Sequence, residues 1–199
     1  MIEIDTVTHR RDPIYHTIIP AEMEHLPLGA LPREATILKH QQRMLPGVMD
    51  AHLAQGCVCR YHLYVKLKKK REGEPKNVII GAFSSRYDIK QVVVVDDGVD
   101  VHNPTEVELG AATRFQADRD LVVISSAQGS LLDSSTTLNN RPDDEYQGVS
   151  ANVALDATKP VVCDKHVFTR VSGPGEDEVD LEREVDSGAR PDWAKILAE

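Results

Sequence analysis

Four consecutive β-branched residues, Val92 to Val95, constrain the fold of this chain more than any other stretch. A strand without polar alternation is buried on both faces, as in a parallel sheet covered by helices. A helix is expected next, because Asn103 can cap it, Pro104 suits its first position and Glu106 can complete a capping box. The stretch therefore predicts a buried strand followed by a helix.

A second apolar run, Leu121 to Ile124, follows the expected helix. Strand, helix and strand predict a right-handed βαβ unit whose strands end on the same edge of a sheet. That edge would collect the segments DDGVD, residues 96–100, and SSAQGS, residues 125–130. Because open α/β sheets bind ligands beyond the carboxyl ends of their strands, we expect function at this edge.

Hydrophobic spacing predicts the other elements. A helix is expected over residues 32–44, opened by Pro32, with Leu31, Ala35 and Leu38 on its apolar face. Residues 48–54 and 59–67 alternate like two strands joined by a short turn, and residues 74–87 read as a second helix. This order predicts an α/β fold with a mixed sheet and a βαβ core covered by helices.

The two ends of the chain differ from the middle. Residues 1–15 begin with an alternating strand that has no partner nearby, so we expect it to pair with a partner domain or another subunit. Residues 16–133 form the predicted α/β domain. Residues 134–199 turn polar and acidic and are interpreted as an extended arm and tail, in which Trp193 is expected to dock onto an apolar surface.

Composition narrows the function classes. A net charge of -9 argues against nucleic acid and anionic lipid as partners, because both require a cationic face. The basic run of residues 66–71 is interpreted as a solvated strand end and turn. No apolar run is long enough to cross a membrane and no signal peptide is visible. Three cysteines make no disulfide framework, so a cytoplasmic location is expected.

Two clusters offer metal chemistry, and each has a simpler interpretation. Asp96, Asp97 and Asp100 could bind Mg²⁺, but we favour a turn and helix cap. The cysteines at 57 and 59 with His62 could bind zinc, but they lack a fourth ligand, and a half-buried strand is favoured.

The segment SSAQGS could cradle a phosphate through its backbone. It lacks the lysine of a P-loop and opens no visible helix, so it is interpreted as a loop that shapes a site. No Ser-His-Asp order or paired-glutamate spacing is present. Without a further comparison the residues support only an α/β domain.

Read together, several segments resemble the carboxyl-terminal half of the UbiD family of decarboxylases. They include VTHRRDPIYHTIIP, HLPLGALPREATILKHQQ, CRYHLYVKL, KNVIIGAF and GSLLDSS. The most specific is the ordered series VVVVDDGVDVHNPTEVELGAATRFQADRDLVVI. The likeness covers residues 6–135, with a weaker echo in RPDWAKI.

The resemblance implies chemistry that uses prenylated FMN with Mn²⁺ and K⁺. Family members decarboxylate, or reversibly carboxylate, aromatic and α,β-unsaturated acids, and the cofactor carries the difficult step. Their metal ligands and Glu-Arg-Glu network lie in regions that precede the part matched here. No catalytic or metal-binding residue is therefore assigned to this chain.

By position in the matched motifs, four residues correspond to ones that face the substrate in relatives. They are His25, Leu28, Ser130 and Leu132. Ser84 falls where some relatives place a lysine close to the cofactor, and a serine there weakens that contact. The resemblance also implies that this region packs over the flavin domain and forms much of the oligomer interface.

These implications lead to two hypotheses. In the first, the chain is a subunit of a split UbiD-type enzyme whose companion, an amino-terminal flavin-binding chain, carries the cofactor, so the chain is inactive alone. In the second, it is a non-catalytic assembly or scaffold module with the same fold. A fragment of a longer protein is a third reading, which the initiating Met1 makes less favoured.

Overall fold

The computed structural model describes residues 3–137, 148–163 and 167–169. The chain divides into two compact units, residues 1–162 and 163–199, and every helix and strand described below belongs to the first. The predicted acidic tail, Trp193 included, lies outside the described residues. In chain order the elements are α1 (Leu26–Met44), β1 (Val48–Leu53), η1 (Gln55–Cys57), β2 (His62–Leu67), α2 (Glu74–Ser85), β3 (Gln91–Asp96), α3 (Pro104–Arg114), β4 (Leu121–Gln128), α4 (Ser134–Thr137) and β5 (Val149–Ala157).

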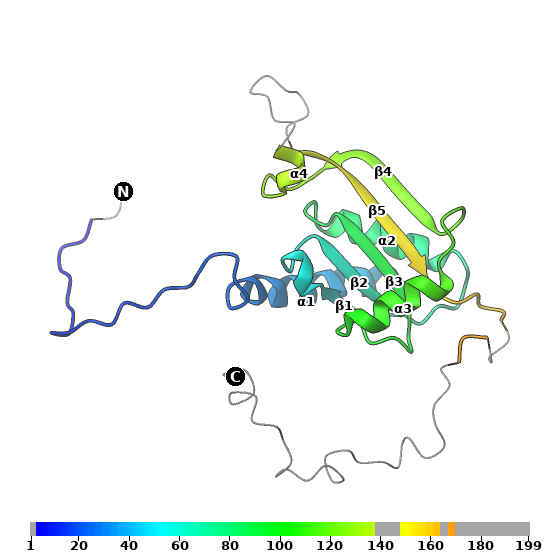
Figure 1. Cartoon of the computed structure of the whole chain (residues 1–199), viewed down its shortest axis with the longest axis horizontal. Coiled ribbons are helices and arrows are strands. Elements are labelled where there is room, and N and C mark those ends of the chain that lie inside the picture. The colour runs from blue at the N-terminus through cyan, green and yellow to red at the C-terminus, as the bar shows by residue number, and fades with distance from the viewer. Residues whose placement is uncertain (1–2, 138–147, 164–166, 170–199) are drawn as a thin grey trace, which may run out of the picture. The chain divides into compact units, whose positions relative to one another are not determined.

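The described strands form one five-stranded sheet in the order β1-β2-β3-β5-β4 (Figure 1). β2 and β5 run parallel to β3, whereas β1 is antiparallel to β2 and β4 is antiparallel to β5. The predicted α/β class with a mixed sheet is confirmed.

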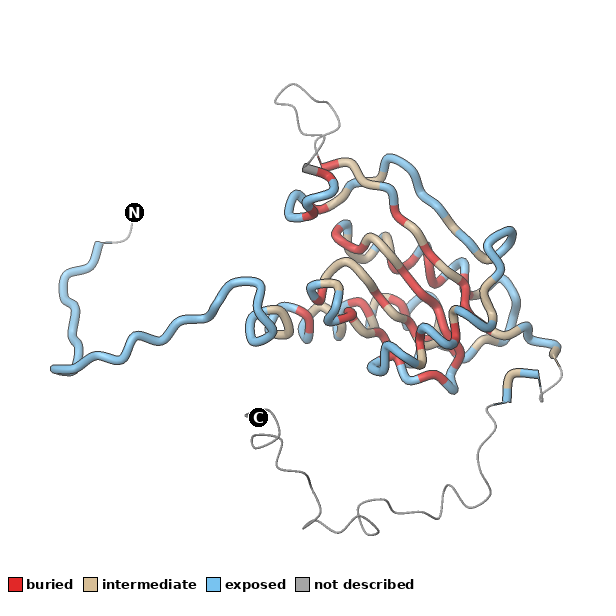
Figure 2. Tube along the Cα trace, viewed as in Figure 1, coloured by how far each residue is buried: buried red, intermediate tan, exposed pale blue. Residues whose placement is uncertain are grey.

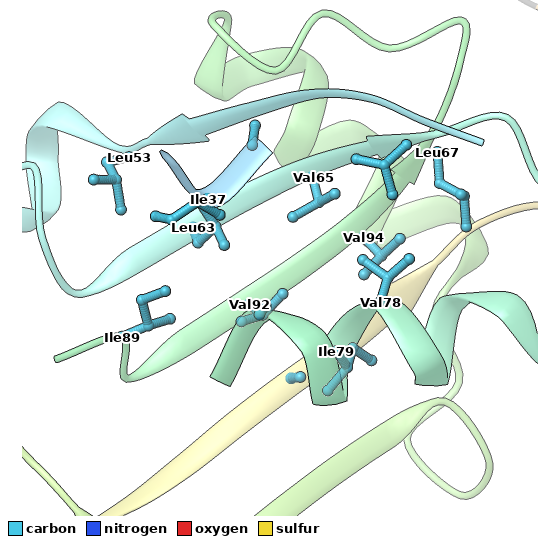
Figure 3. Close-up of a cluster of buried hydrophobic side chains, with 14 of the residues drawn as sticks. Ile37, Leu53, Leu63, Val65, Leu67, Val78, Ile79, Ile89, Val92 and Val94 are labelled. Atoms are coloured by element: carbon cyan, nitrogen blue, oxygen red, sulfur yellow. The ribbon is translucent and has the colours of Figure 1, made fainter. Parts of the chain in front are cut away.

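The valine run forms β3, in the middle of this sheet, and it is buried on both faces as predicted. Val92 and Val94 are fully buried in a cluster that includes residues of α1 and α2 (Figure 3). Val93 and Val95 point to the opposite face, where they pack with Val107 of α3. Figure 2 shows β3 as an almost continuous buried strand. Helices therefore cover both faces of the sheet at β3.

The predicted βαβ unit joining β3, α3 and β4 is wrong. β4 is antiparallel to β5 and hence to β3, and it lies at the far edge of the sheet. The parallel partners of β3 are β2, reached through α2, and β5. β3 and β4 therefore end at opposite ends of the sheet's strands. Consequently residues 96–100, which follow β3, and residues 125–130, at the end of β4, do not lie together.

The boundary expected at residue 133 is also displaced. Residues 149–157, interpreted from the sequence as part of an extended arm with short strand-like pieces, form β5 between β3 and β4. The first compact unit accordingly continues to Val162.

Helix α1 begins six residues earlier than predicted. Pro27 occupies the first turn, and Pro32 lies inside the helix. A proline near an exposed helix start removes a hydrogen bond where the cost is smallest. The buried residues of α1 are Ala30, Ile37 and Gln41. Of the predicted apolar face, Leu38 packs against the core, whereas Leu31 and Ala35 are exposed.

The remaining predicted elements are confirmed with small changes of boundary. β1 and β2 form the expected antiparallel pair, joined through η1, and α2 covers most of the predicted second helix. Asn103 caps α3, because its Oδ1 accepts a hydrogen bond from Thr105 N at 3.1 Å. The Glu106 carboxylate accepts from Asp100 N at 2.9 Å, so it holds the turn before the helix. In β4 the register shifts between Ile124 and Ala127, where Ser126 has a φ of 55°.

The amino-terminal arm, residues 3–19, contains no helix or strand and is exposed (Figure 2). A strand that needs a companion's sheet is not tested by a single chain and stays a prediction. Among the described helices, none combines the length and hydrophobicity needed to span a bilayer.

Candidate functional site

The parallel strands define two edges of the sheet. β2, β3 and β5 begin at one edge, which we call the amino edge, and end at the other, the carboxyl edge. The antiparallel strands β1 and β4 run the other way and therefore end at the amino edge. The amino edge is thus built from strand starts and from the segments that follow β1 and β4.

All five residues implied by the resemblance belong to segments at the amino edge. Helix α1 starts there, because Glu34 Oε1 accepts a hydrogen bond from Leu53 N at the end of β1, at 2.7 Å. Helix α2 ends just before β3 starts, and residues 129–133 follow β4 (Figure 1). These residues therefore lie at the amino edge, whereas the sequence pattern predicted function at the carboxyl edge.

Three of these residues present surface. Leu28 is 61% exposed and Leu132 is 71% exposed, an unfavourable state for large apolar side chains. His25 takes the N-cap position of α1, where its Nδ1 accepts a hydrogen bond from Ala21 N at 3.1 Å. That bond fixes the imidazole ring and leaves Nε2 as the other polar atom of the side chain.

The two serines are occupied by local hydrogen bonds. Ser130 is buried, and its Oγ accepts from Leu132 N at 3.2 Å, which shapes the turn after β4. Ser84 Oγ donates to Gly81 O at 3.0 Å within α2 and lies 3.4 Å from His40 Nε2. Both side chains hold their own segments in place.

A pocket of about 210 Å³ opens beside the start of α1. It combines apolar walls with ionisable groups, the combination typical of small-molecule sites. Its lining residues are Pro27, Ala30, Leu31, Glu34, His52, Leu53, Gln55, Cys59 and His102.

A chain of ionisable side chains runs along this pocket. His52 Nδ1 lies 2.9 Å from Glu34 Oε1, although it is not aligned for a hydrogen bond. The rings of His52 and His102 have centroids 4.5 Å apart, and His102 Nε2 lies 3.2 Å from Asp50 Oδ2. Two imidazoles in contact therefore lie between two carboxylates, Glu34 of α1 and Asp50 of β1.

The electrostatics of the chain centre on Glu34. Burial by itself raises the pKa of this carboxyl, but contact with His52 and the hydrogen bond from Leu53 N bring the pKa below its usual value. Burial, and next the Glu34 charge, raise the pKa of the Cys59 thiol. The pocket therefore holds a carboxylate beside a neutral thiol.

Other ionisable groups at the amino edge were not singled out from the sequence. Lys90 Nζ donates to Asp133 Oδ2 at 2.7 Å and to Ser135 Oγ at 2.6 Å, which ties the start of β3 to the segment after β4. Asp88 lies between the guanidinium groups of Arg33 and Arg60, at 3.8 and 3.9 Å. No local motif announces these pairs, because each joins residues far apart in the sequence.

Neither metal cluster considered from the sequence is assembled. Cys57 Sγ lies 2.9 Å from His62 Nδ1, but among the described residues no three His, Cys, Asp or Glu side chains converge to hold a metal ion. Burial, followed by the Lys90 charge, lowers the pKa of His62. Asp96 pairs with Arg114 at 2.6 Å and accepts from Lys159 N. It therefore links the end of β3 to the end of α3 and to the segment after β5.

Comparison with known proteins gives this edge a context. A family model described as the carboxyl-terminal domain of 3-octaprenyl-4-hydroxybenzoate carboxy-lyase matches residues 27–157. The anhydromevalonate phosphate decarboxylase of Methanocaldococcus jannaschii is 36% identical over 174 residues, which cover 87% of this chain and 40% of the relative. The gallate decarboxylase of Lactiplantibacillus plantarum is 31% identical over 165 residues, covering 80% of this chain and 34% of the relative.

Solved structures agree with these relatives. The UbiD-class enzyme HmfF from Pelotomaculum thermopropionicum, solved with FMN, has a TM-score of 0.78 and 43% identity, over 89% of this chain and 38% of that one. The vanillic acid decarboxylase ShVdcCD of Sedimentibacter hydroxybenzoicus in its open form has a TM-score of 0.67 and 25% identity, over 89% and 37%. The chain thus spans 34% to 40% of the length of these relatives.

Proposed function

This chain belongs to the UbiD family of carboxy-lyases, in which it corresponds to the carboxyl-terminal domain, and we propose that it is a subunit of a split UbiD-type enzyme. The companion polypeptide in this proposal carries the flavin-binding region and the catalytic residues. The assembled enzyme removes a carboxyl group from, or adds one to, an aromatic or α,β-unsaturated acid. This chain contributes walls of the substrate pocket and part of the oligomer interface.

The exposed amino-terminal arm is the observation that carries the proposal. Its large apolar residues include Ile4, Val7, Ile14 and Tyr15, all at least 74% exposed. Several exposed apolar side chains on one segment are typical of an interaction surface, because leaving them in water is costly. The arm therefore has the character of a segment that is buried against another protein surface.

The residues of this chain do not fit the role of principal cofactor holder. The described part offers no convergent donor set for Mn²⁺, and Ser84 uses its hydroxyl within its own helix. Prenylated FMN, Mn²⁺ and K⁺ are accordingly assigned to the companion, with Ser84 at most a neighbour of the cofactor. The FMN in the related HmfF structure supports a flavin in the assembled enzyme.

The pocket walls are assigned to the amino edge. Leu28 and Leu132 offer exposed apolar surface, His25 offers a positioned imidazole, and Ser130 fixes the turn that carries Leu132. A flavin-binding companion seated on this edge would enclose these residues with the cofactor.

Co-purification tests the subunit assignment. The full chain is expressed with a flavin-domain companion of the UbiD family from the same source, with and without residues 1–19 of this chain. We expect a stable complex, and decarboxylation only when both chains are present. Deletion of the arm should weaken the association of the two chains. Equal activity of the companion with and without this chain would overturn the assignment.

The pocket role is tested in the assembled complex. Leu132→Ala should change relative activity among acids of different size, because the shorter side chain enlarges the pocket that the substrate enters. Leu109→Ala is the matched control, since Leu109 is also exposed, at 53%, but lies on α3. If both variants keep the wild-type preference, Leu132 does not line the pocket.

One observation favours the alternative of a non-catalytic assembly module. β4 exposes Leu121, Val123 and Ile124 at the edge of the sheet, a surface suited to building oligomers. This alternative predicts a stable homo-oligomer of the lone chain and no effect of Leu132→Ala on substrate preference. Sedimentation of the purified chain together with the substrate panel separates the two functions.

A further inference from the structure

A second cavity lies at the carboxyl edge of the sheet, away from every residue used in the proposed function. Its volume is about 420 Å³, within the size range of small-molecule sites. It is lined by four cationic side chains, three acidic ones, a threonine and a proline: Lys69, Lys76, Arg114, Arg119, Glu72, Asp120, Asp156, Thr158 and Pro160. In open α/β sheets this edge is the usual place for a ligand.

Lys69 is the most unusual member of the cavity. Its side chain is only 6% exposed, and its Nζ pairs with Glu72 Oε2 at 2.8 Å. An ammonium group has three donors, and within the described residues Glu72 takes one of them. Burying an ammonium group with donors unused is costly, so the arrangement is suited to a further acceptor.

Lys76 adds a second cation to the cavity, at a helix position that disfavours positive charge. It lies in the first turn of α2, where the helix dipole is positive and lysine is disfavoured. Its Nζ donates to a neutral acceptor, Arg119 O, at 3.0 Å. The positive end of α2 and the Lys76 ammonium therefore add their fields at the cavity.

Each acidic residue of the cavity accepts a backbone N–H, and Glu72 also pairs with Lys69. Glu72 Oε1 accepts from Val161 N at 2.6 Å, and Asp120 Oδ2 accepts from Gln116 N at 2.9 Å. Asp156 Oδ1 accepts from both the N–H and the hydroxyl of Thr158. These carboxylates hold turns, whereas the lysines keep donors for a ligand.

Asp156 is the most buried carboxyl of the cavity. Burial raises its pKa, an effect that hydrogen bonds from Thr158 and the Lys69 charge reduce and the nearby Asp120 charge reinforces. The Lys69 ammonium therefore acts on Asp156 as well as on Glu72.

We propose that this cavity binds the phosphate group of a small ligand, with Lys69 and Lys76 as its principal donors and Arg119 at its rim. The Arg119 side chain is 65% exposed and reaches Asp120 only at 3.4 Å, so it can turn toward a bound anion. A phosphate offers several oxygens to donors that approach from different directions, as the two ammonium groups do. Free phosphate and a phosphate monoester share this chemistry.

Calorimetric titration of the full chain at constant ionic strength tests the proposal. Inorganic phosphate and glycerol 3-phosphate are the two probes, and tighter binding of one or the other identifies the source of the phosphate group. Lys69→Gln and Lys76→Gln should each weaken binding by about tenfold or more, as expected for a lost charge-assisted hydrogen bond.

Lys70→Gln is the matched control, because it removes the same charge from an exposed neighbour that does not line the cavity. It should change affinity by less than about twofold. Lys76 is exposed, so its variant is expected to fold even if Lys69→Gln does not. Absence of saturable binding by the wild type, or equal losses in Lys70→Gln and Lys76→Gln, would overturn the site.

Discussion

The two edge strands of the sheet, β1 and β4, are similar in apolar content but differ in exposure. Val48, Ala51 and Leu53 of β1 are each no more than 3% exposed, because α1 packs over them. Val123 of β4 is 58% exposed, and no residue of that strand is buried, although Val122 packs partly against the core (Figure 2). The chain closes one side of its sheet with its own helices and leaves the other apolar side open.

The difference shows that, for a strand at the edge of a sheet, apolar residues predict the strand without predicting its burial. Burial comes from the layer above the strand, which distant parts of the chain must supply. The side at β1 should accordingly behave as core and the side at β4 as surface.

The largest expected effect compares Leu53→Asp with Val123→Asp. An aspartate at position 53 would bury a charge under α1, so we expect a loss of more than about 4 kcal/mol in the free energy of unfolding. At position 123 the same residue meets solvent and should cost about 1 kcal/mol or less. Urea unfolding measures both, and equal losses would break the comparison.

Gly81→Ala sharpens the comparison by testing how tightly α1 and α2 are packed over the β1 side. A Cβ at position 81 would lie 2.6 Å from Oε1 of the fully buried Gln41. Overpacking of this kind costs about 1–3 kcal/mol. Gly29→Ala is the matched control, since this helical glycine has open space and alanine should stabilise it by about 0.5–1 kcal/mol. Thermal unfolding in which both variants gain stability would indicate a loose layer.

Glu34→Gln tests the polar tie between α1 and β1. Removing a charged hydrogen-bond acceptor should cost about 1.5 kcal/mol near neutral pH. The folded-state pKa of Glu34 is lowered from 4.5, so this stabilisation is complete above 4.5 and is lost as pH falls through the folded-state pKa. The difference between the melting temperatures of the wild type and Glu34→Gln should therefore shrink on acidification. A difference that grows below pH 4.5 would reverse the assigned sign.

Asp133→Asn should have the smallest effect, because it weakens a tie on the open side. Burial raises the pKa of Asp133, but Lys90 and Ser135 hold it below its usual value overall. The Lys90 side chain is 35% exposed, so solvent screens the pair and we expect about 1 kcal/mol or less. A double-mutant cycle with Lys90→Gln isolates the coupling, and a coupling as large as the loss in Leu53→Asp would remove the distinction between the sides.

Local signals predicted the centre of the fold well. The valine run specified a strand buried on both faces, and Asn103 with Pro104 fixed the start of α3. Such features depend on neighbours within one turn or one strand, so the sequence contains them.

Strand direction and strand order were not accessible in the same way. β4 was expected to be parallel to β3, but its direction is set by pairing with β5, which lies after residues 138–147 in the chain. β5 itself was obscured because the residues it buries include Asn152 and Asp156, so its apolar alternation marks the less buried face. Tertiary pairing overrides a local pattern of this kind.

The candidate site was predictable only through family resemblance. His25, Leu28, Ser84, Ser130 and Leu132 come from three separate segments. The fold brings those segments to one edge, although no spacing in the sequence relates them. Their roles in substrate or cofactor contact stay predictions. Lys90 and Glu34 were missed for the same reason, because their partners are 43 and 19 residues away.

The irregular residue pair in β4 has a consequence for solubility at high concentration. The register shift between Ile124 and Ala127, with Ser126 in a left-handed conformation, breaks the outer rim of the sheet into short pieces. A rim interrupted in this way is a poor template for the edge-to-edge strand pairing that seeds fibrils. Deleting Ser126 would restore a regular edge strand. We expect the exposed apolar strand, once regular, to nucleate amyloid-like growth.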